Sequence, residues 1–256
     1  MYTVSYQLME DRMKRLTIVA AVLAIAAGLQ AEVQKKDVDI KASDGLNLKG
    51  TYFSPGRPGP AMLLLHQCNM DRHAWDGLAN DLSAAGFHVL AIDYRGYGES
   101  GGERYTDAAQ RSAAMKQKWP GDVDAAYDFL IKQKGVDGSR VAAGGASCGV
   151  GQSSELALRH HEIKALMLLS GGASEAAKTY LASAPGVPVL GAASEGDTSA
   201  AKGIKEAVEA SKNPQSTLKI YSGTEHGVPM FAKNMDLEPM IVAWLKAQLS
   251  AGTGTR

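Results

Sequence analysis

The sequence carries no excess of charge of either sign. Its 27 lysines and arginines balance 27 aspartates and glutamates, which gives a formal net charge of +0 at pH 7. A nucleic-acid-binding protein usually shows a basic stripe on its surface, so this balance argues against a nucleic-acid partner. The sequence also lacks internal repeats and low-complexity blocks, which argues against a repeat architecture. We therefore expect a small-molecule partner.

Long hydrophobic runs are scarce too. The apolar run at residues 16–29 is shorter than the roughly 18 residues that a membrane-spanning helix needs. It follows the basic segment 12–15 and ends just before Ala31, a pattern typical of a secretory signal peptide. We expect translation to start at Met13 and cleavage to occur near Ala31. Leu29 is large for the position three before the cut, so a retained lipid-facing anchor stays open as an alternative.

The signal peptide predicts the domain organisation. Residues 1–31 form an upstream extension and the signal peptide, and residues 32–256 form one enzyme-sized domain. We expect a periplasmic or secreted protein that keeps no stable membrane span after signal cleavage.

Within this domain, short apolar runs alternate with segments of helical periodicity. The runs 37–42 and 47–53 flank Ser43-Asp44-Gly45 and predict a hairpin. Six later runs are typical of buried parallel strands, at residues 61–65, 88–92, 140–143, 165–170, 187–192 and 217–221. Helical segments lie between them, at residues 74–85, 122–134, 151–161, 200–211 and 237–250. The alternation predicts an α/β fold with a mostly parallel central sheet flanked by helices.

The segment Gly145-Ala146-Ser147-Cys148-Gly149 matches the pattern G-x-S-x-G. It lies between a predicted strand and a predicted helix, which is the context of a nucleophile elbow. The sharp turn of the elbow brings strand and helix together, so the residues two places either side of the serine must be small. Gly145 and Gly149 meet this demand, and Ser147 is the candidate nucleophile.

A serine hydroxyl needs a histidine base, and the histidine needs an acid that fixes its tautomer. Asp197 and His226 follow Ser147 in the order serine, acid, histidine, and each comes just after a predicted strand. We predict them as the catalytic acid and base. Glu195 stays open as a second candidate for the acid.

The tetrahedral intermediate of such a reaction needs backbone N–H donors around its oxygen. Cys148, the residue after the nucleophile, is expected to supply the first donor. The loop that follows the strand at 61–65 is expected to supply the second, from the amide of Cys68 with that of Gln67 as the alternative.

The sequence is also poor in cysteine, with two residues, Cys68 and Cys148. An oxidising compartment permits a disulfide between them, provided that their Cα atoms lie within about 7 Å of each other. The alternative is a pair of small buried residues without a bond, and the sequence favours this second possibility slightly.

Asp93-Tyr94-Arg95-Gly96-Tyr97-Gly98-Glu99-Ser100 matches the D-x-R-G-x-G-x-S loop of the α/β-hydrolase superfamily. The domain resembles this superfamily over nearly its whole length, and the dienelactone hydrolase family in particular. The resemblance implies an α/β-hydrolase fold and a structural role for the D-x-R-G loop. Residues 171–186 leave no room for the large cap domain that some members carry, whereas the insertion 101–121 is expected either to rim the pocket or to form a solvated face.

Characterised dienelactone hydrolases use a cysteine nucleophile, so Cys148 is an alternative to Ser147. A frame centred on Cys148 would be flanked by Ala146 and Val150, and the β-branched Val150 would crowd the turn. The sequence therefore favours Ser147.

These observations predict a serine hydrolase that cleaves carboxylic esters or lactones of small soluble substrates through an acyl-enzyme, without a cofactor or metal. Two alternatives stay open. One is a peptidase of the prolyl oligopeptidase type, and the other is a non-catalytic binding protein on the same scaffold. The sequence does not indicate the oligomeric state.

Overall fold

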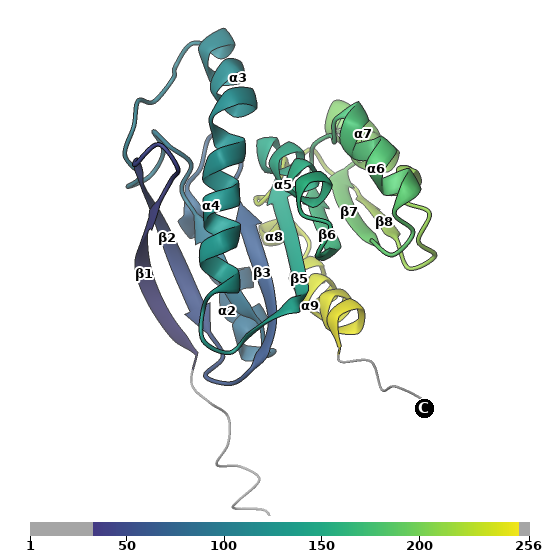
Figure 1. Cartoon of the computed structure of the whole chain (residues 1–256). Helices are drawn as coiled ribbons and strands as arrows, with labels where there is room; N and C mark the ends of the chain where they lie inside the picture. The colour runs from purple at the N-terminus through teal and green to yellow at the C-terminus, as the bar shows by residue number, and fades with distance from the viewer. Residues whose placement is uncertain (1–32, 251–256) are drawn as a thin grey trace, which may run out of the picture. The chain divides into compact units, whose positions relative to one another are not determined.

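One sheet of eight strands organises residues 33–250, the part of the chain that this computed structural model describes. The strands are β1 (Gln34–Lys41), β2 (Asn47–Ser54), β3 (Gly59–Leu65), β4 (His88–Ile92), β5 (Val136–Ala146), β6 (Ile163–Leu169), β7 (Val189–Ser194) and β8 (Thr217–Tyr221). Their order across the sheet is β1-β2-β4-β3-β5-β6-β7-β8. β2 runs antiparallel to β1 and β4, and the strands from β3 to β8 are parallel (Figure 1). The predicted mostly parallel sheet is confirmed.

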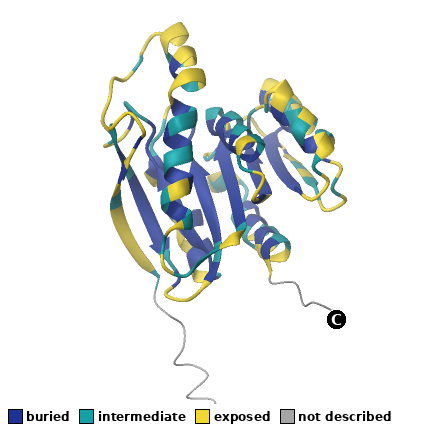
Figure 2. Cartoon of the chain, in the orientation of Figure 1, coloured by how far each residue is buried: buried dark blue, intermediate teal, exposed yellow. Residues whose placement is uncertain are grey.

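Helices cover both faces of this sheet (Figure 1). One face carries α3 (Ala108–Gln117), α4 (Trp119–Ile131), α5 (Cys148–Arg159), α6 (Glu175–Ser183) and α7 (Thr198–Ala210). The other carries the 3-10 helix η1 (Arg72–Trp75), α2 (Asp76–Ala84), α8 (Met230–Lys233) and α9 (Leu237–Leu249). The inner strands are largely buried, and exposure is concentrated on the outer sides of the helices, on the edge strands β1 and β8 and on the loops (Figure 2).

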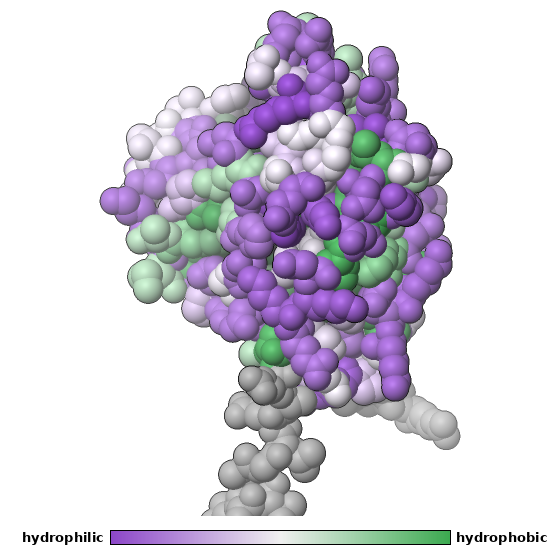
Figure 3. Space-filling model, turned by 90° about the vertical axis from the view of Figure 1, so that its left-hand side faces the viewer, coloured by the Kyte–Doolittle hydropathy of each residue, from purple (hydrophilic) through white to green (hydrophobic). Residues whose placement is uncertain are grey.

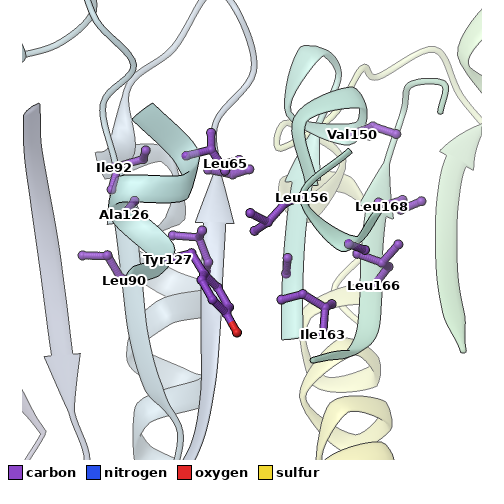
Figure 4. Close-up of a cluster of buried hydrophobic side chains, with 14 of the residues drawn as sticks. Leu65, Leu90, Ile92, Ala126, Tyr127, Val150, Leu156, Ile163, Leu166 and Leu168 are labelled. Carbon is purple, nitrogen blue, oxygen red and sulfur yellow. The ribbon is translucent and has the colours of Figure 1, made fainter. Parts of the chain in front are cut away.

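Alternate residues of a central strand point into the two layers of the core. Leu63 and Leu65 of β3 belong to the buried cluster on the α4 face, whereas Met62 and Leu64 belong to the cluster on the α2 face. Figure 4 labels Leu65 of β3 and Tyr127 of α4 among the side chains of the first of these clusters. Burying each leucine contributes roughly 1.5–3 kcal/mol, so these two clusters hold the sheet between its helices.

Edge strand β1 is protected by its charges. Its sequence is QKKDVDIK, and most of its residues are exposed. Figure 3 looks onto the side that lies at the left of Figure 1, where β1 is found, and hydrophilic residues predominate there while hydrophobic ones form small separate groups. Charged side chains on an edge strand discourage pairing with another chain.

The structure adds elements that the sequence analysis missed. α3 buries Ala114 alone, and α6 buries Ala177 and Leu181, so neither has the apolar stripe on which the prediction of helices rested. Asp107 and Ser174 cap the two helices, because their side chains accept hydrogen bonds from the amides of Gln110 and Ala177.

The predicted signal peptide and its cleavage site near Ala31 lie outside the described residues. No helix in residues 33–250 combines the length and the hydrophobicity needed to cross a bilayer.

Candidate active site

The turn between β5 and α5 has the geometry of a nucleophile elbow. Ser147 adopts φ 54° and ψ −117°, a left-handed conformation that costs energy in a residue other than glycine. A Cβ atom on Gly145 would overlap the carbonyl oxygen of Gly149, and one on Gly149 would overlap the carbonyl oxygen of Leu65. The close approach of strand and helix therefore requires both glycines, as the sequence predicted.

Asp197 and His226 come together at the same edge of the sheet. The Nδ1–H group of His226 donates to Oδ2 of Asp197 at 2.6 Å. A carboxylate only accepts, so this bond leaves Nε2 of His226 as the ring's acceptor. The Asp197 side chain is 19% exposed and that of His226 is 43% exposed, so the acid is shielded while the histidine remains accessible.

Hydrogen bonds between their loops fix this pair. The amide of Glu195 donates to the carbonyl of Tyr221 at 2.8 Å, and the hydroxyl of Ser194 donates to the carbonyl of Glu225 at 2.7 Å. Glu195 is exposed, and no hydrogen bond between its side chain and His226 occurs among the described residues. Of the two candidate acids, Asp197 is thus the one that contacts the histidine.

A single cavity of about 510 Å³ joins the three predicted catalytic residues. Its lining consists of Ser147, Ser170, Gly171, Gly172, Asp197, Ser199, Ala200, Lys202, Gly203, Glu206 and His226. Small and charged residues make up this lining, and the insertion 101–121 contributes nothing to it. Within residues 33–250, no group of three or more His, Cys, Asp or Glu side chains is arranged to hold a metal ion.

Cys68 and Cys148 are joined by a disulfide, and their Cα atoms lie 5.8 Å apart. The slight preference of the sequence for unpaired cysteines is therefore wrong. The reason is topological, because β3 and β5 are adjacent parallel strands and the loop after β3 meets the first turn of α5 at one edge of the sheet. A disulfide-bonded sulfur is not a thiolate, so this state of Cys148 does not support the alternative cysteine nucleophile.

The amides predicted as oxyanion donors lie on these two segments. Cys148 is the first residue of α5, where backbone N–H groups have no partner within the helix. In the part of the chain that the structure describes, the amides of Gln67, Cys68 and Cys148 have no hydrogen-bond acceptor. The positive end of the α5 dipole also lies at this point, which favours an anion there.

The D-x-R-G loop is tied into the fold. Asp93 is fully buried and accepts hydrogen bonds from the amide of Arg72 at 2.7 Å and from that of Glu99 at 2.9 Å. The guanidinium of Arg72, itself 1% exposed, pairs with Asp93 and Glu99 and donates to Thr51 Oγ1 at 2.9 Å. This network fits the structural role expected for Asp93. The sequence did not predict that Arg72 is buried and pairs with Asp93.

Curated proteins similar to this chain match about half of it. An uncharacterized protein of Mycobacterium tuberculosis is 34% identical over 126 residues, which cover 48% of this chain and 41% of that protein. An uncharacterized 31.7 kDa protein of Escherichia coli, from the traX-finO intergenic region, is 29% identical over 133 residues, or 52% of this chain and 44% of that protein. The chain thus spans less than half the length of the curated relatives it matches.

Solved structures with the same fold cover most of the chain. The Pyrococcus furiosus esterase Pf2001 superposes with a TM-score of 0.69 at 18% identity, covering 85% of this chain and 92% of that one. A cold-adapted esterase from an Arctic intertidal metagenomic library gives a TM-score of 0.65 at 22% identity, covering 86% of this chain and 95% of that one. At these identities the similarity establishes the fold.

A family model described as alpha/beta hydrolase fold matches residues 60–188. The matched segment contains the elbow, both cysteines and the D-x-R-G loop, and it ends before Asp197 and His226. The expected α/β-hydrolase fold is confirmed, and the chain belongs to the alpha/beta hydrolase fold family.

Proposed function

We propose that this protein is a serine hydrolase that cleaves carboxylic esters or lactones of small soluble substrates. One observation carries the proposal. The 2.6 Å hydrogen bond between His226 and Asp197 orients a histidine at the cavity that also contains Ser147, and Ser147 has the backbone conformation of an elbow nucleophile.

In the proposed mechanism, Ser147 Oγ attacks the substrate carbonyl while Nε2 of His226 takes its proton. The carboxylate of Asp197 stabilises the imidazolium that forms. The amides of Cys148 and Cys68, with that of Gln67 as the alternative to Cys68, donate to the oxyanion of the tetrahedral intermediate. His226 then protonates the leaving alcohol, and water hydrolyses the acyl-enzyme by the same route.

The composition of the cavity supports small polar substrates. Gly171, Gly172, Gly203 and Ala200 leave space beside Ser147 but offer little apolar surface. Transfer of an acyl chain from water gains about 0.8 kcal/mol per buried CH₂, and this gain needs an apolar wall. Short acyl groups are therefore favoured over long ones.

The resemblance to dienelactone hydrolases supports lactones as substrates beside simple esters. Serine in place of that family's cysteine nucleophile distinguishes this chain from characterised members. We also propose that the protein works in the periplasm or outside the cell, on the basis of the signal-peptide pattern at residues 12–31. The disulfide fits an oxidising compartment.

The test is hydrolysis of p-nitrophenyl acetate, butyrate and octanoate by residues 32–256. We expect turnover with a preference for the two shorter esters. Ser147→Ala and His226→Ala are each expected to lower kcat by at least about 10⁴-fold. Ser183→Ala, which removes an exposed hydroxyl from the end of α6, is the matched control and keeps the wild-type rate.

Other outcomes of the same test separate the alternatives. Cleavage of proline-containing peptides without cleavage of esters would favour the prolyl oligopeptidase type. Absence of both activities, together with no labelling of Ser147 by a fluorophosphonate probe, would favour a binding protein. A higher rate on octanoate than on acetate would contradict the preference for short acyl groups.

A further inference from the structure

The disulfide between Cys68 and Cys148 joins two segments that the proposed mechanism uses together. Cys68 lies in the loop between β3 and η1, and Cys148 begins α5 directly after Ser147. The two residues lie 80 positions apart in the sequence. Their amides are the donors proposed for the oxyanion, so the bond links one donor residue to the other.

The disulfide and the hydrogen bonds of Gln67 hold the loop around Cys68, and the amide of Val228 donates to the Gln67 side chain at 2.9 Å. The loop has no regular secondary structure from His66 to Asp71. Its internal hydrogen bonds are centred on Gln67, whose carbonyl oxygen accepts from the amide of Met70 at 3.0 Å and from Nδ1–H of His66 at 2.8 Å. Neither bond reaches α5. The disulfide is therefore the covalent restraint that sets the position of Cys68 relative to the elbow.

We infer that the Cys68–Cys148 disulfide is a positioning element of the oxyanion hole, and that its reduction lowers turnover by loosening that hole. The inference rests on the proposed function, because it concerns the oxyanion of the same reaction. An oxyanion hole stabilises the transition state through donors that are already in place before the reaction. A donor on a freely moving loop loses part of this advantage, because it must be ordered during the reaction.

Cys68 and Cys148 are each partly exposed, and Cys148 directly follows the cavity residue Ser147, so we expect a small reductant to reach the bond. A dithiol attacks one sulfur as its thiolate, the S–S bond breaks, and a mixed disulfide forms. The second thiol of the reagent then closes its own disulfide. The protein ends with two cysteine thiols, and the dithiol is oxidised by two electrons.

The expected effect falls on kcat rather than KM. Oxyanion donors bind the tetrahedral state more strongly than the planar substrate, so loosening them removes an interaction made mainly in the transition state. Removal of a whole oxyanion-hole donor lowers kcat by about 10²–10³-fold. Loosening a donor has a smaller effect, so we expect a fall of roughly ten- to a hundredfold, with KM changed by less than about threefold.

The experiment measures p-nitrophenyl acetate hydrolysis by residues 32–256 before and after reduction with dithiothreitol. Iodoacetamide labelling and mass spectrometry count the free thiols in each sample, and far-UV circular dichroism confirms that the reduced protein is folded at the assay temperature. Affinity for an alkyl trifluoromethyl ketone, which forms an oxyanion on the serine, is measured in both states. We expect this affinity to fall together with kcat, which simple loss of folded protein would not produce.

The double variant Cys68→Ala/Cys148→Ala is the matched control. It is expected to show the kcat of the reduced wild type and no response to dithiothreitol. Reoxidation of the wild type should restore both kcat and inhibitor affinity.

The outcomes separate this inference from the proposed function. An oxidised protein that does not hydrolyse the ester overturns the proposed function and the inference with it. An oxidised protein that hydrolyses the ester, and loses neither kcat nor inhibitor affinity on complete reduction, overturns the inference alone. Labelling of both cysteines without reductant, or wild-type kcat in the double variant, overturns it as well.

Discussion

The side-chain carbonyl of Gln67 accepts a hydrogen bond from the amide of Val228 at 2.9 Å. Gln67 is 2% exposed and follows β3, whereas Val228 lies two residues after His226. The Nε2 group of Gln67 donates to Asn69 Oδ1 at 2.8 Å, so both ends of the amide are engaged. One side chain thus links the loop proposed to hold the oxyanion to the loop that carries the histidine.

This link predicts a graded response at position 67. Gln67→Leu leaves the partly buried amide of Val228 without its acceptor, which costs about 1 kcal/mol, and we expect kcat to fall as His226 loses its position. Gln67→Glu keeps an acceptor for Val228 and should retain more of kcat than the leucine variant. Asn69→Ala removes the other hydrogen-bond partner of Gln67, and its kcat should lie between those of Gln67→Leu and the wild type. Equal kcat in the two position-67 variants would contradict this link.

The elbow predicts a strict requirement for glycine at position 149. A Cβ atom there meets the backbone of Leu65 and His66, which cannot move aside as a flexible side chain would. We expect Gly149→Ala to lower the free energy of unfolding by about 3 kcal/mol or more, measured by urea denaturation. Gly138→Ala, where an added Cβ meets nothing within 4 Å, should stay within about 1 kcal/mol of the wild type. Similar losses of unfolding free energy in the two variants would show that the close approach of Gly149 to Leu65 does not require glycine.

The Arg72 network predicts a stability defect at a distance from the triad. Arg72→Met leaves the fully buried carboxylate of Asp93 without its cation, and breaking a buried pair costs about 3–5 kcal/mol. Lys35→Met provides the comparison, because Lys35 pairs with Asp76 at 2.8 Å on the surface and such pairs contribute about 0–1 kcal/mol. Chemical denaturation measures the free energy of unfolding of both variants. A loss in Arg72→Met no larger than in Lys35→Met would contradict the role given to the buried pair.

The two candidate acids are separated by their contacts with His226. Asp197→Asn replaces the acceptor of Nδ1–H with a group that can stabilise the wrong tautomer, and we expect kcat to fall by about 10⁴-fold on p-nitrophenyl acetate. Glu195→Gln changes an exposed side chain for which no hydrogen bond to the ring occurs in residues 33–250, and it should keep nearly the wild-type kcat. A larger loss in Glu195→Gln than in Asp197→Asn would assign the acid to Glu195.

The sequence predicted the parts of this site that depend on local patterns. Gly145 and Gly149 lie two residues either side of Ser147, and the steric demand of one turn requires both glycines. Asp197 and His226 were located because each follows an apolar run, and parallel strands bring such positions to one edge. The strands of the central sheet were predicted from the same apolar runs.

Contacts between distant side chains had no such signal. The hydrogen bond from Val228 to Gln67 joins residues 161 positions apart, and the disulfide joins residues 80 apart. Arg72 resembles any loop arginine until the fold buries it against Asp93. No periodicity encodes these pairings, because they depend on how the strands are ordered in the sheet.

Burial of His66 predicts a loss of stability in mild acid. Burial lowers the pKa of His66 below the 6.5 of an unfolded chain, and the ring is held neutral between the carbonyl of Gln67 and the amide of Tyr94. Below pH 6.5 the unfolded chain therefore binds a proton that folded His66 does not, so the free energy of unfolding falls as the pH is lowered. This contribution is fully present above the unfolded pKa, and its slope is at most about 1.4 kcal/mol per pH unit. We expect Tm, measured between about pH 7.5 and 5, to fall less steeply in His66→Gln than in the wild type. An unchanged slope in His66→Gln would show that this ring takes up its proton equally well in the folded protein.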